Sequence, residues 1–171
     1  MPIYHWLPEY ATKATLRSDS RSKSDTAPDS IPCYPPISDR KPISPAAHKI
    51  LSIGQEMALV KREIIQGSCW DYANAVYNRA GYPNRNGQRI TIFKGKKSGP
   101  YAAIALIEPG DFLYYINHSY YDVEHSAIFI EWIDIKRNTA LMLSYGGEHR
   151  KAPARYRPYD LSSVYRIIRA N

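Results

Sequence analysis

Hydrophobic residues in the first half of the folded region recur at helical spacings. Between residues 50 and 64 the spacing alternates between three and four, which places five apolar side chains on one helix face. They are Ile50, Ile53, Met57, Val60 and Ile64. Ser44 as N-cap and Pro45 at the first helical position mark the start, and Gly67 is expected to end the helix. The pattern predicts one long helix from Pro45 to about residue 66.

A second helix is predicted directly after Gly67. Ser68 is its N-cap, and Asp71, three residues later, completes a weak capping box. Gly81 and Pro83 are expected to end it. One side of this helix is lined by apolar residues, namely Ala73, Val76, Tyr77 and Ala80.

The remaining sequence has the alternating, β-branched and aromatic character of strands. Strands are predicted over 89–93, over 111–116 after a Pro109-Gly110 turn, and over the closing segment "SSVYRIIR". The clearest hairpin pairs 125–135 with 139–145 around a Lys-Arg-Asn turn. Helices come first and an antiparallel sheet follows, so the predicted fold class is α+β. We interpret "HRKAPARYRPYD" (149–160) as a solvated basic strip, and contact with acidic groups of a substrate is the alternative.

The first 44 residues differ in composition from the rest. Eight of the 13 prolines and none of the nine glycines lie in residues 1–45, and the segment is rich in Ser and charge. Such a segment buries too little apolar surface to offset its chain entropy. We therefore predict a flexible arm over 1–44 and one domain over 45–171.

Charge and apolar content narrow the function classes. The net charge is +7, and a net charge of +6 lies after residue 45. This favours an anionic partner or simply a soluble basic surface. No apolar run approaches 18 residues, so no membrane span is expected. The opening residues lack a signal-peptide pattern, and two cysteines make no disulfide framework.

Cys69 is the first candidate for chemistry. It lies in the first turn of the second predicted helix, where the helix dipole and unpaired N–H groups stabilise a thiolate, the attacking form of cysteine. The same N–H groups can hold the oxyanion of a tetrahedral intermediate. A lone helical cysteine is more often a small buried apolar residue, so Cys69 needs a partner. His125, at the head of an apolar strand, is the candidate base, although a histidine at a strand end is often a structural rim residue.

These motifs together resemble the NlpC-type cell-wall peptidases and their CHAP-domain relatives, which are small papain-like cysteine hydrolases. "GSCWDYANAVYNRAG" matches the nucleophile helix, Pro109-Gly110-Asp111 matches the turn before the first strand, and "HSAIFI" from His125 matches the base strand. The resemblance covers about residues 50–168. It implies a papain-like fold with N-terminal helices packed on an antiparallel sheet. It also implies Cys69 as nucleophile, His125 as base, no cofactor, and the peptide stem of peptidoglycan as substrate.

The sequence departs from the family around the site. Trp70-Asp71-Tyr72 follows the cysteine, and the loop "INHSYYDVE" is long and aromatic, so we assign Trp70, Asp71 and Tyr121 to substrate binding. The family's third residue, which orients the histidine, lies near the end of the next strand. Ser144, His149 and a backbone carbonyl could fill that role, and we favour His149 because a second imidazole can accept from the first.

Other interpretations stay open. His118, Asp122, Glu124 and His125 do not have the spacing of a known metal site, so no metal is expected. The Tyr-rich loop and "FKGKKSG" could bind single-stranded nucleic acid, but we favour an aromatic rim of a groove. A non-catalytic basic domain that binds nucleic acid or wall polymer, and a hydrolase acting on another amide or ester, are the alternatives.

The lack of a signal-peptide pattern and the predicted flexible arm give expectations about biological setting. We expect a bacterial or phage-derived protein, made in the cytoplasm without a signal peptide and exported by a specialised route as an effector, or acting as a lysin. An immunity protein is the expected partner, and the protein is expected to be a monomer.

Overall fold

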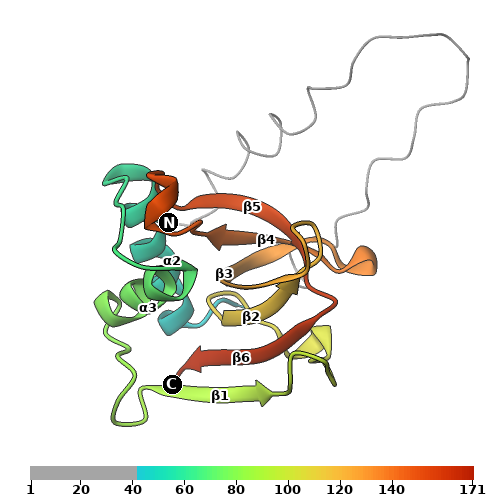
Figure 1. Ribbon diagram of the computed structural model, residues 1–171. Coiled ribbons are helices and arrows are strands. Elements are labelled where there is room, and N and C mark those ends of the chain that lie inside the picture. Colours follow the sequence, from blue (N-terminus) through green and yellow to red (C-terminus); the bar gives the residue numbers. More distant parts are fainter. Residues whose placement is uncertain (1–41) are drawn as a thin grey trace, which may run out of the picture. The chain divides into compact units, whose positions relative to one another are not determined.

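A computed structural model describes residues 42–171. The prediction for the N-terminal arm therefore lies outside the described residues, apart from the last three positions of the arm. The described part contains two α-helices and a six-stranded antiparallel sheet, which confirms the predicted α+β class. Figure 1 shows both helices on the same side of the sheet. Within residues 42–171, no helix is both long and apolar enough to cross a bilayer.

The first helix is shorter than predicted. Helix α2 spans Pro45–Gln55, with the Ser44 side chain accepting from the N–H of Ala47, and a π-helical turn, η3, continues over Glu56–Val60. The chain then turns at Arg62, whose backbone is left-handed with φ of 51°. The wide π turn rotates later residues away from the buried face, so Val60 and Ile64 are 75% and 50% exposed. The predicted single helix to residue 66 is therefore wrong beyond Val60.

Helix α3 begins and ends where the sequence predicts. It spans Cys69–Arg79, and both halves of the predicted capping box form between Ser68 and Asp71. The four residues predicted to line its apolar side, Ala73, Val76, Tyr77 and Ala80, are all buried. Capping and burial together fix the N-terminus of α3, and with it the position of Cys69.

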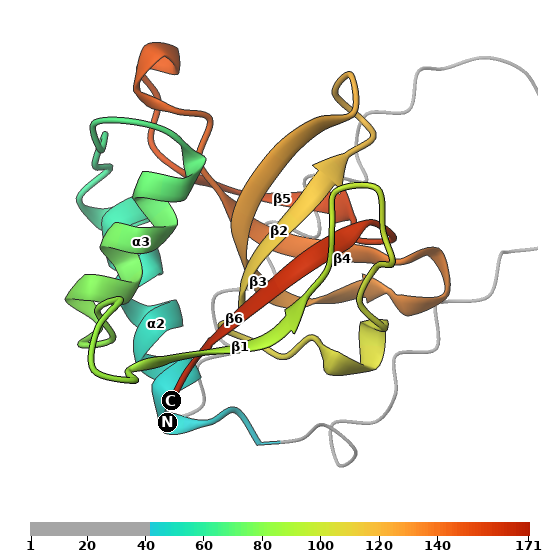
Figure 2. The same ribbon diagram turned by 60° about the horizontal axis from the view of Figure 1, so that its bottom comes forward.

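The sheet has the strand order β1-β6-β2-β3-β4-β5, and every neighbouring pair is antiparallel. Figures 1 and 2 show how β6 (Val164–Ala170) inserts between β1 (Arg89–Lys94) and β2 (Phe112–Asn117). The predicted hairpin is present as β3 (Val123–Asp134) and β4 (Thr139–Ser144). Strand β5 (Arg155–Asp160) was missed, because this exposed edge strand carries Pro158 and charged residues instead of an apolar face.

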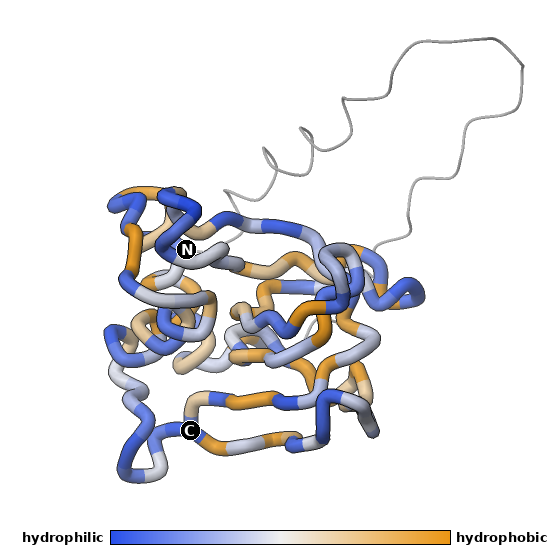
Figure 3. Tube along the Cα trace, in the orientation of Figure 1, coloured by the Kyte–Doolittle hydropathy of each residue, from blue (hydrophilic) through white to orange (hydrophobic). Residues whose placement is uncertain are grey.

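Each face of the sheet carries its own apolar cluster. One cluster joins the helices to residues such as Phe112, Ile128 and Leu143, and the other covers the opposite face with residues such as Tyr115 and Phe129. Figure 3 shows the corresponding pattern, with hydrophobic residues along the strands and helix faces and hydrophilic residues in the connecting loops. The alternation along β3 therefore decides which face each site residue reaches.

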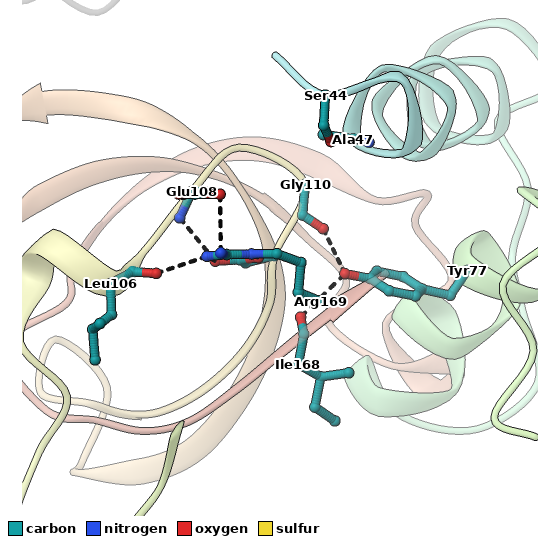
Figure 4. Close-up of polar contacts among 9 residues, drawn as sticks. Ser44, Ala47, Tyr77, Leu106, Glu108, Gly110, Ile168 and Arg169 are labelled. Carbon is teal, nitrogen blue, oxygen red and sulfur yellow. Dashed lines mark hydrogen bonds and ion pairs between the residues drawn. The ribbon is translucent and has the colours of Figure 1, made fainter. Parts of the chain in front are cut away.

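The Pro109-Gly110-Asp111 turn has a structural role. Gly110 has φ of 88°, and a Cβ there would lie 2.9 Å from Ala47, so only glycine fits. The fully buried carboxylate of Asp111 pairs with Arg169 of β6 at 2.7 and 2.8 Å. Figure 4 shows Arg169 in this cluster and the hydroxyl of Tyr77 donating to the carbonyls of Gly110 and Ile168. The turn thus links α3, β2 and the C-terminal strand.

Candidate active site

Cys69 is the first residue of α3, half-buried and with a free thiol. Its Sγ accepts a hydrogen bond from Ser126 Oγ of β3 at 3.4 Å. The neighbouring N–H of Trp70 bonds to Ser68 Oγ, but within residues 42–171 no acceptor takes the N–H of Cys69 itself. A thiol that faces a hydroxyl donor and an unpaired N–H is suited to bear negative charge during an acyl transfer.

Asp71 holds the helix end in place. Its Oδ2 accepts from the N–H of Ser68 at 2.7 Å and from Ser68 Oγ at 2.8 Å, and these bonds, the backbone one first, lower the pKa of the carboxyl. A Cβ on Gly67 would lie 2.3 Å from the same oxygen, so glycine is required at that position. The structure gives Asp71 a capping role, and its predicted contact with substrate stays a prediction.

The ring of His125 is held by a relay of two hydroxyls. Its Nε2 lies 2.8 Å from Ser144 Oγ, which lies 2.9 Å from the hydroxyl of Tyr159 in β5. The rings of Tyr115 and Tyr159 lie against the imidazole, with centroids 5.6 and 5.5 Å away. His125 is therefore fixed in orientation by hydrogen bonds and ring packing together.

The orienting residue differs from the one we favoured from sequence. His149 lies exposed in the short helix η6 (Glu148–Arg150), and the His125 ring is bonded by Ser144 instead. The physical reason is register: Ser144 is the last residue of β4 and shares a sheet face with His125, whereas His149 lies beyond the strand. The predicted contact between His149 and the ring of His125 is therefore wrong.

Burial keeps the His125 imidazole neutral. Removal from water, followed by the positive charge of Arg150, lowers the pKa of His125 to about 4. The imidazole is therefore neutral at neutral pH, and it is a weaker base there than a group whose pKa lies near the operating pH.

Cys69 and His125 approach the same part of β3 from different sides. Ser126 points towards α3, whereas His125 belongs to the face that carries Tyr115. Within the described residues no hydrogen bond joins the thiol to the imidazole. The ring of Tyr115 packs on the imidazole, and burial first, then Tyr159 and Cys69, raise the pKa of that phenol well above its usual value.

Two loops flank this region. The segment after β4 reaches the start of α3, where the N–H of Glu148 donates to the carbonyl of Gly67 at 2.9 Å. From the same segment, Arg150 lies over the ring of Tyr120 in the β2–β3 loop, 5.5 Å from its centroid. Tyr121 lies at the tip of that loop and is 88% exposed, so it is free to contact a ligand.

Trp70 connects Cys69 to the helix-facing side of the sheet. Its Nε1 donates to the hydroxyl of Tyr114 in β2 at 2.5 Å, and its side chain is 37% exposed. The ring of Tyr114 in turn carries the guanidinium of Arg166, 5.3 Å from the ring centroid. Aromatic and cationic groups therefore extend from the cysteine across the sheet.

The residues weighed as metal ligands in the sequence form hydrogen bonds and ion pairs with protein groups. His118 bonds Asp122 through Nδ1 and Ser163 through Nε2, each at 2.6 Å, while Glu124 pairs with Lys97 and Tyr165. The Asp122-His118-Ser163 arrangement has the order of a catalytic triad, but Ser163 is only 5% exposed. It anchors the β2–β3 loop to the turn before β6.

Sequence reasoning missed Ser126, Tyr159 and Arg166. Ser126 could have been found, because strand alternation places the residue after His125 on the helix-facing side. Tyr159 could not, because β5 itself was not predicted. Arg166 reaches the region through strand order, which carries no local signal.

Comparisons with known proteins add little. No model of a known protein family matches the chain, and a search of curated proteins finds no match. Among solved structures, the fold is similar to the crystal structure of the wild-type endolysin LysIME-EF1, with a TM-score of 0.45 and 15% sequence identity. The match covers 72% of this chain and 63% of that chain, less than two thirds of its length.

Proposed function

We propose that the protein is a papain-like cysteine hydrolase that cleaves amide bonds in the peptide stems of bacterial peptidoglycan. The observation that supports this most directly is the meeting of α3 with β3. There Ser126 donates to the thiol of Cys69, and the next residue, His125, is oriented by Ser144. The substrate class rests on the resemblance of the Cys69, Pro109-Gly110-Asp111 and His125 motifs to the NlpC-type peptidases.

In the proposed reaction the thiolate of Cys69 attacks the amide carbonyl, and the unpaired N–H of Cys69 binds the oxyanion. With Nε2 donating to Ser144, the Nδ1 of His125 takes the thiol proton and delivers it to the leaving amine. Water then hydrolyses the thioester and restores the thiol. The step requires a rearrangement that brings Nδ1 of His125 from the sheet face of Tyr115 to within hydrogen-bond reach of Cys69.

The test is digestion of purified peptidoglycan by the wild-type protein and by Cys69→Ala, with the soluble fragments identified by mass spectrometry. New stem-peptide fragments from the wild type alone would support the proposal and identify the bond. Intact peptidoglycan from both, with circular dichroism showing folded protein, would reject it. Binding to peptidoglycan or nucleic acid without cleavage would favour the non-catalytic basic domain.

We extend the proposal to delivery and protection, which rest on the sequence alone. An exported effector would be toxic in the compartment that holds the wall, where an immunity protein would protect its producer, and harmless in the cytoplasm. Expression in a Gram-negative host with and without a periplasmic leader tests this. Equal growth in both arms would argue against an effector, whatever the enzymatic result.

A further inference from the structure

Arg166 is a cation without a counterion in the described part of the chain. It lies in β6 between Tyr114 of β2 and Lys94 of β1, its register partners. Its Nε is buried and has no hydrogen-bond partner, and no carboxylate within residues 42–171 pairs with the guanidinium. A guanidinium has five N–H donors and no acceptor, so the terminal N–H groups of half-buried Arg166 are available to an anion although the Nε is buried.

One carboxylate on the same sheet face as Arg166 is already used. Glu124 pairs through one oxygen with Lys97 and through the other with the hydroxyl of Tyr165. Asp111 pairs with Arg169, three residues after Arg166 and on the opposite face of the sheet. The neighbouring register partner on β1, Lys94, is exposed and adds a second positive charge.

The position of Arg166 relative to Cys69 follows from a short series of contacts. The guanidinium lies over the ring of Tyr114, whose hydroxyl accepts from Trp70, the residue next to Cys69. Arg166 is half-buried, so one side is held by the ring while the rest faces solvent. Packing on an aromatic ring preorganises a guanidinium and lowers the entropy lost when it binds.

We infer that Arg166 is a specificity-determining residue that binds a free carboxylate of the substrate, beside the amide that Cys69 attacks. A carboxylate would accept from two N–H groups in the fork geometry that arginine offers and lysine does not. Trp70 and Tyr114 form the apolar floor between the carboxylate and the reacting carbonyl. The inference rests on the proposed function where it concerns cleavage. Binding of the carboxylate can be measured whether or not the protein is a hydrolase.

The binding experiment uses full-length Cys69→Ala, which holds substrate without turning it over. Titration calorimetry compares two stem peptides that differ only in a free carboxylate or its carboxamide. We expect the acid to bind about tenfold or more tightly than the amide, and Arg166→Gln in the same background to abolish this preference. Arg166→Lys should retain only part of it.

Arg155→Gln is the matched control, because it removes the same charge from the exposed edge strand β5. It should leave the preference for the acid unchanged. Thermal melts identify any variant that fails to fold, and Arg166→Lys then serves in place of Arg166→Gln. An acid preference that survives in folded Arg166→Gln, or equal binding of acid and amide by the parent, would overturn the inference.

The two proposals fail in different ways. Selective binding of the acid that depends on Arg166, without cleavage by the wild type, rejects the hydrolase and keeps the carboxylate site. Cleavage that depends on Cys69 but is equally fast for the acid and the amide peptide supports the hydrolase and rejects the role of Arg166.

Discussion

Ser126 Oγ donates to the Sγ of Cys69 across 3.4 Å, and this bond connects the N-terminus of α3 to β3. Adjacent strand residues point to opposite faces, so the bond places the thiol beside the backbone of His125 while the imidazole turns to the other face. The thiol is thus positioned by the residue next to the candidate base.

Replacing Ser126 by Ala should slow alkylation of Cys69. The hydroxyl is a hydrogen-bond donor to the sulfur, and a bond to a charged group contributes about 1.5–3 kcal/mol, so the reaction rate should fall several-fold or more. Iodoacetamide labelling at pH 7, followed by intact mass, measures the rate. Ser162→Ala, at an exposed turn, should label like the wild type. Equal rates in Ser126→Ala and wild type would show that the bond does not stabilise the thiolate.

Ser144 and His149 can be separated by activity. Ser144→Ala removes the partner of His125 Nε2, so kcat should fall about 10- to 100-fold with little change in KM. His149→Ala removes an exposed side chain and should change kcat less than about twofold. Steady-state assays on a stem peptide give both values. The reverse order of effects would restore the orienting role to His149.

The low pKa of His125 should make the fold less stable in acid. The ring has a pKa of about 4 in the folded protein and about 6.5 when unfolded, so the unfolded state binds more protons between these values. Stability is therefore retained above pH 6.5 and lost as the pH falls from 6.5 to 4, by about 1–3 kcal/mol from this group. Urea unfolding across this range measures the slope.

His125→Gln is the control for that pH dependence, since glutamine keeps a polar side chain but does not titrate. The difference in stability between wild type and His125→Gln should shrink as the pH falls from 6.5 to 4. Arg150→Gln should weaken the effect, because Arg150 is the second cause of the lowered pKa. A constant difference over this range would mean that His125 is solvated in the folded state.

Two buried tyrosines provide a matched pair for stability. Tyr77 donates to the carbonyls of Gly110 and Ile168, at 2.6 and 3.2 Å, whereas the equally buried Tyr115 hydroxyl has no partner within residues 42–171. Tyr77→Phe should therefore cost about 1–3 kcal/mol, and Tyr115→Phe should be neutral or stabilising. Chemical denaturation measures both. Equal losses would show that Tyr115 has a partner, such as water, in solution.

Local signals allowed much of this fold to be predicted from the sequence. The cap at Ser68 and the turn at Pro109-Gly110 placed α3 and β2 correctly, because each depends on a few neighbouring residues. The π turn after Gln55 and the edge strand at Arg155 depend on packing with distant segments, so their sequences did not reveal them. At the candidate site, the place of Cys69 at the start of α3 follows from its cap, and Ser144 is among the residues that the sequence offers as partners of His125. Tyr159 and Arg166 reach their places through strand order, which carries no local signal.

The last prediction concerns the β2–β3 loop, which His118 anchors through Asp122 and Ser163. His118→Ala removes both bonds and should increase amide hydrogen exchange in residues 117–123 by about tenfold or more, since each bond contributes about 1 kcal/mol. Exchange in α3 should not change. Ser119→Ala, which removes a single exposed bond within the loop, is the control and should have a smaller effect.

If the loop carries substrate contacts through Tyr121, His118→Ala should raise KM and leave kcat nearly unchanged. Unchanged exchange in His118→Ala would mean that the loop is held by its own backbone turns.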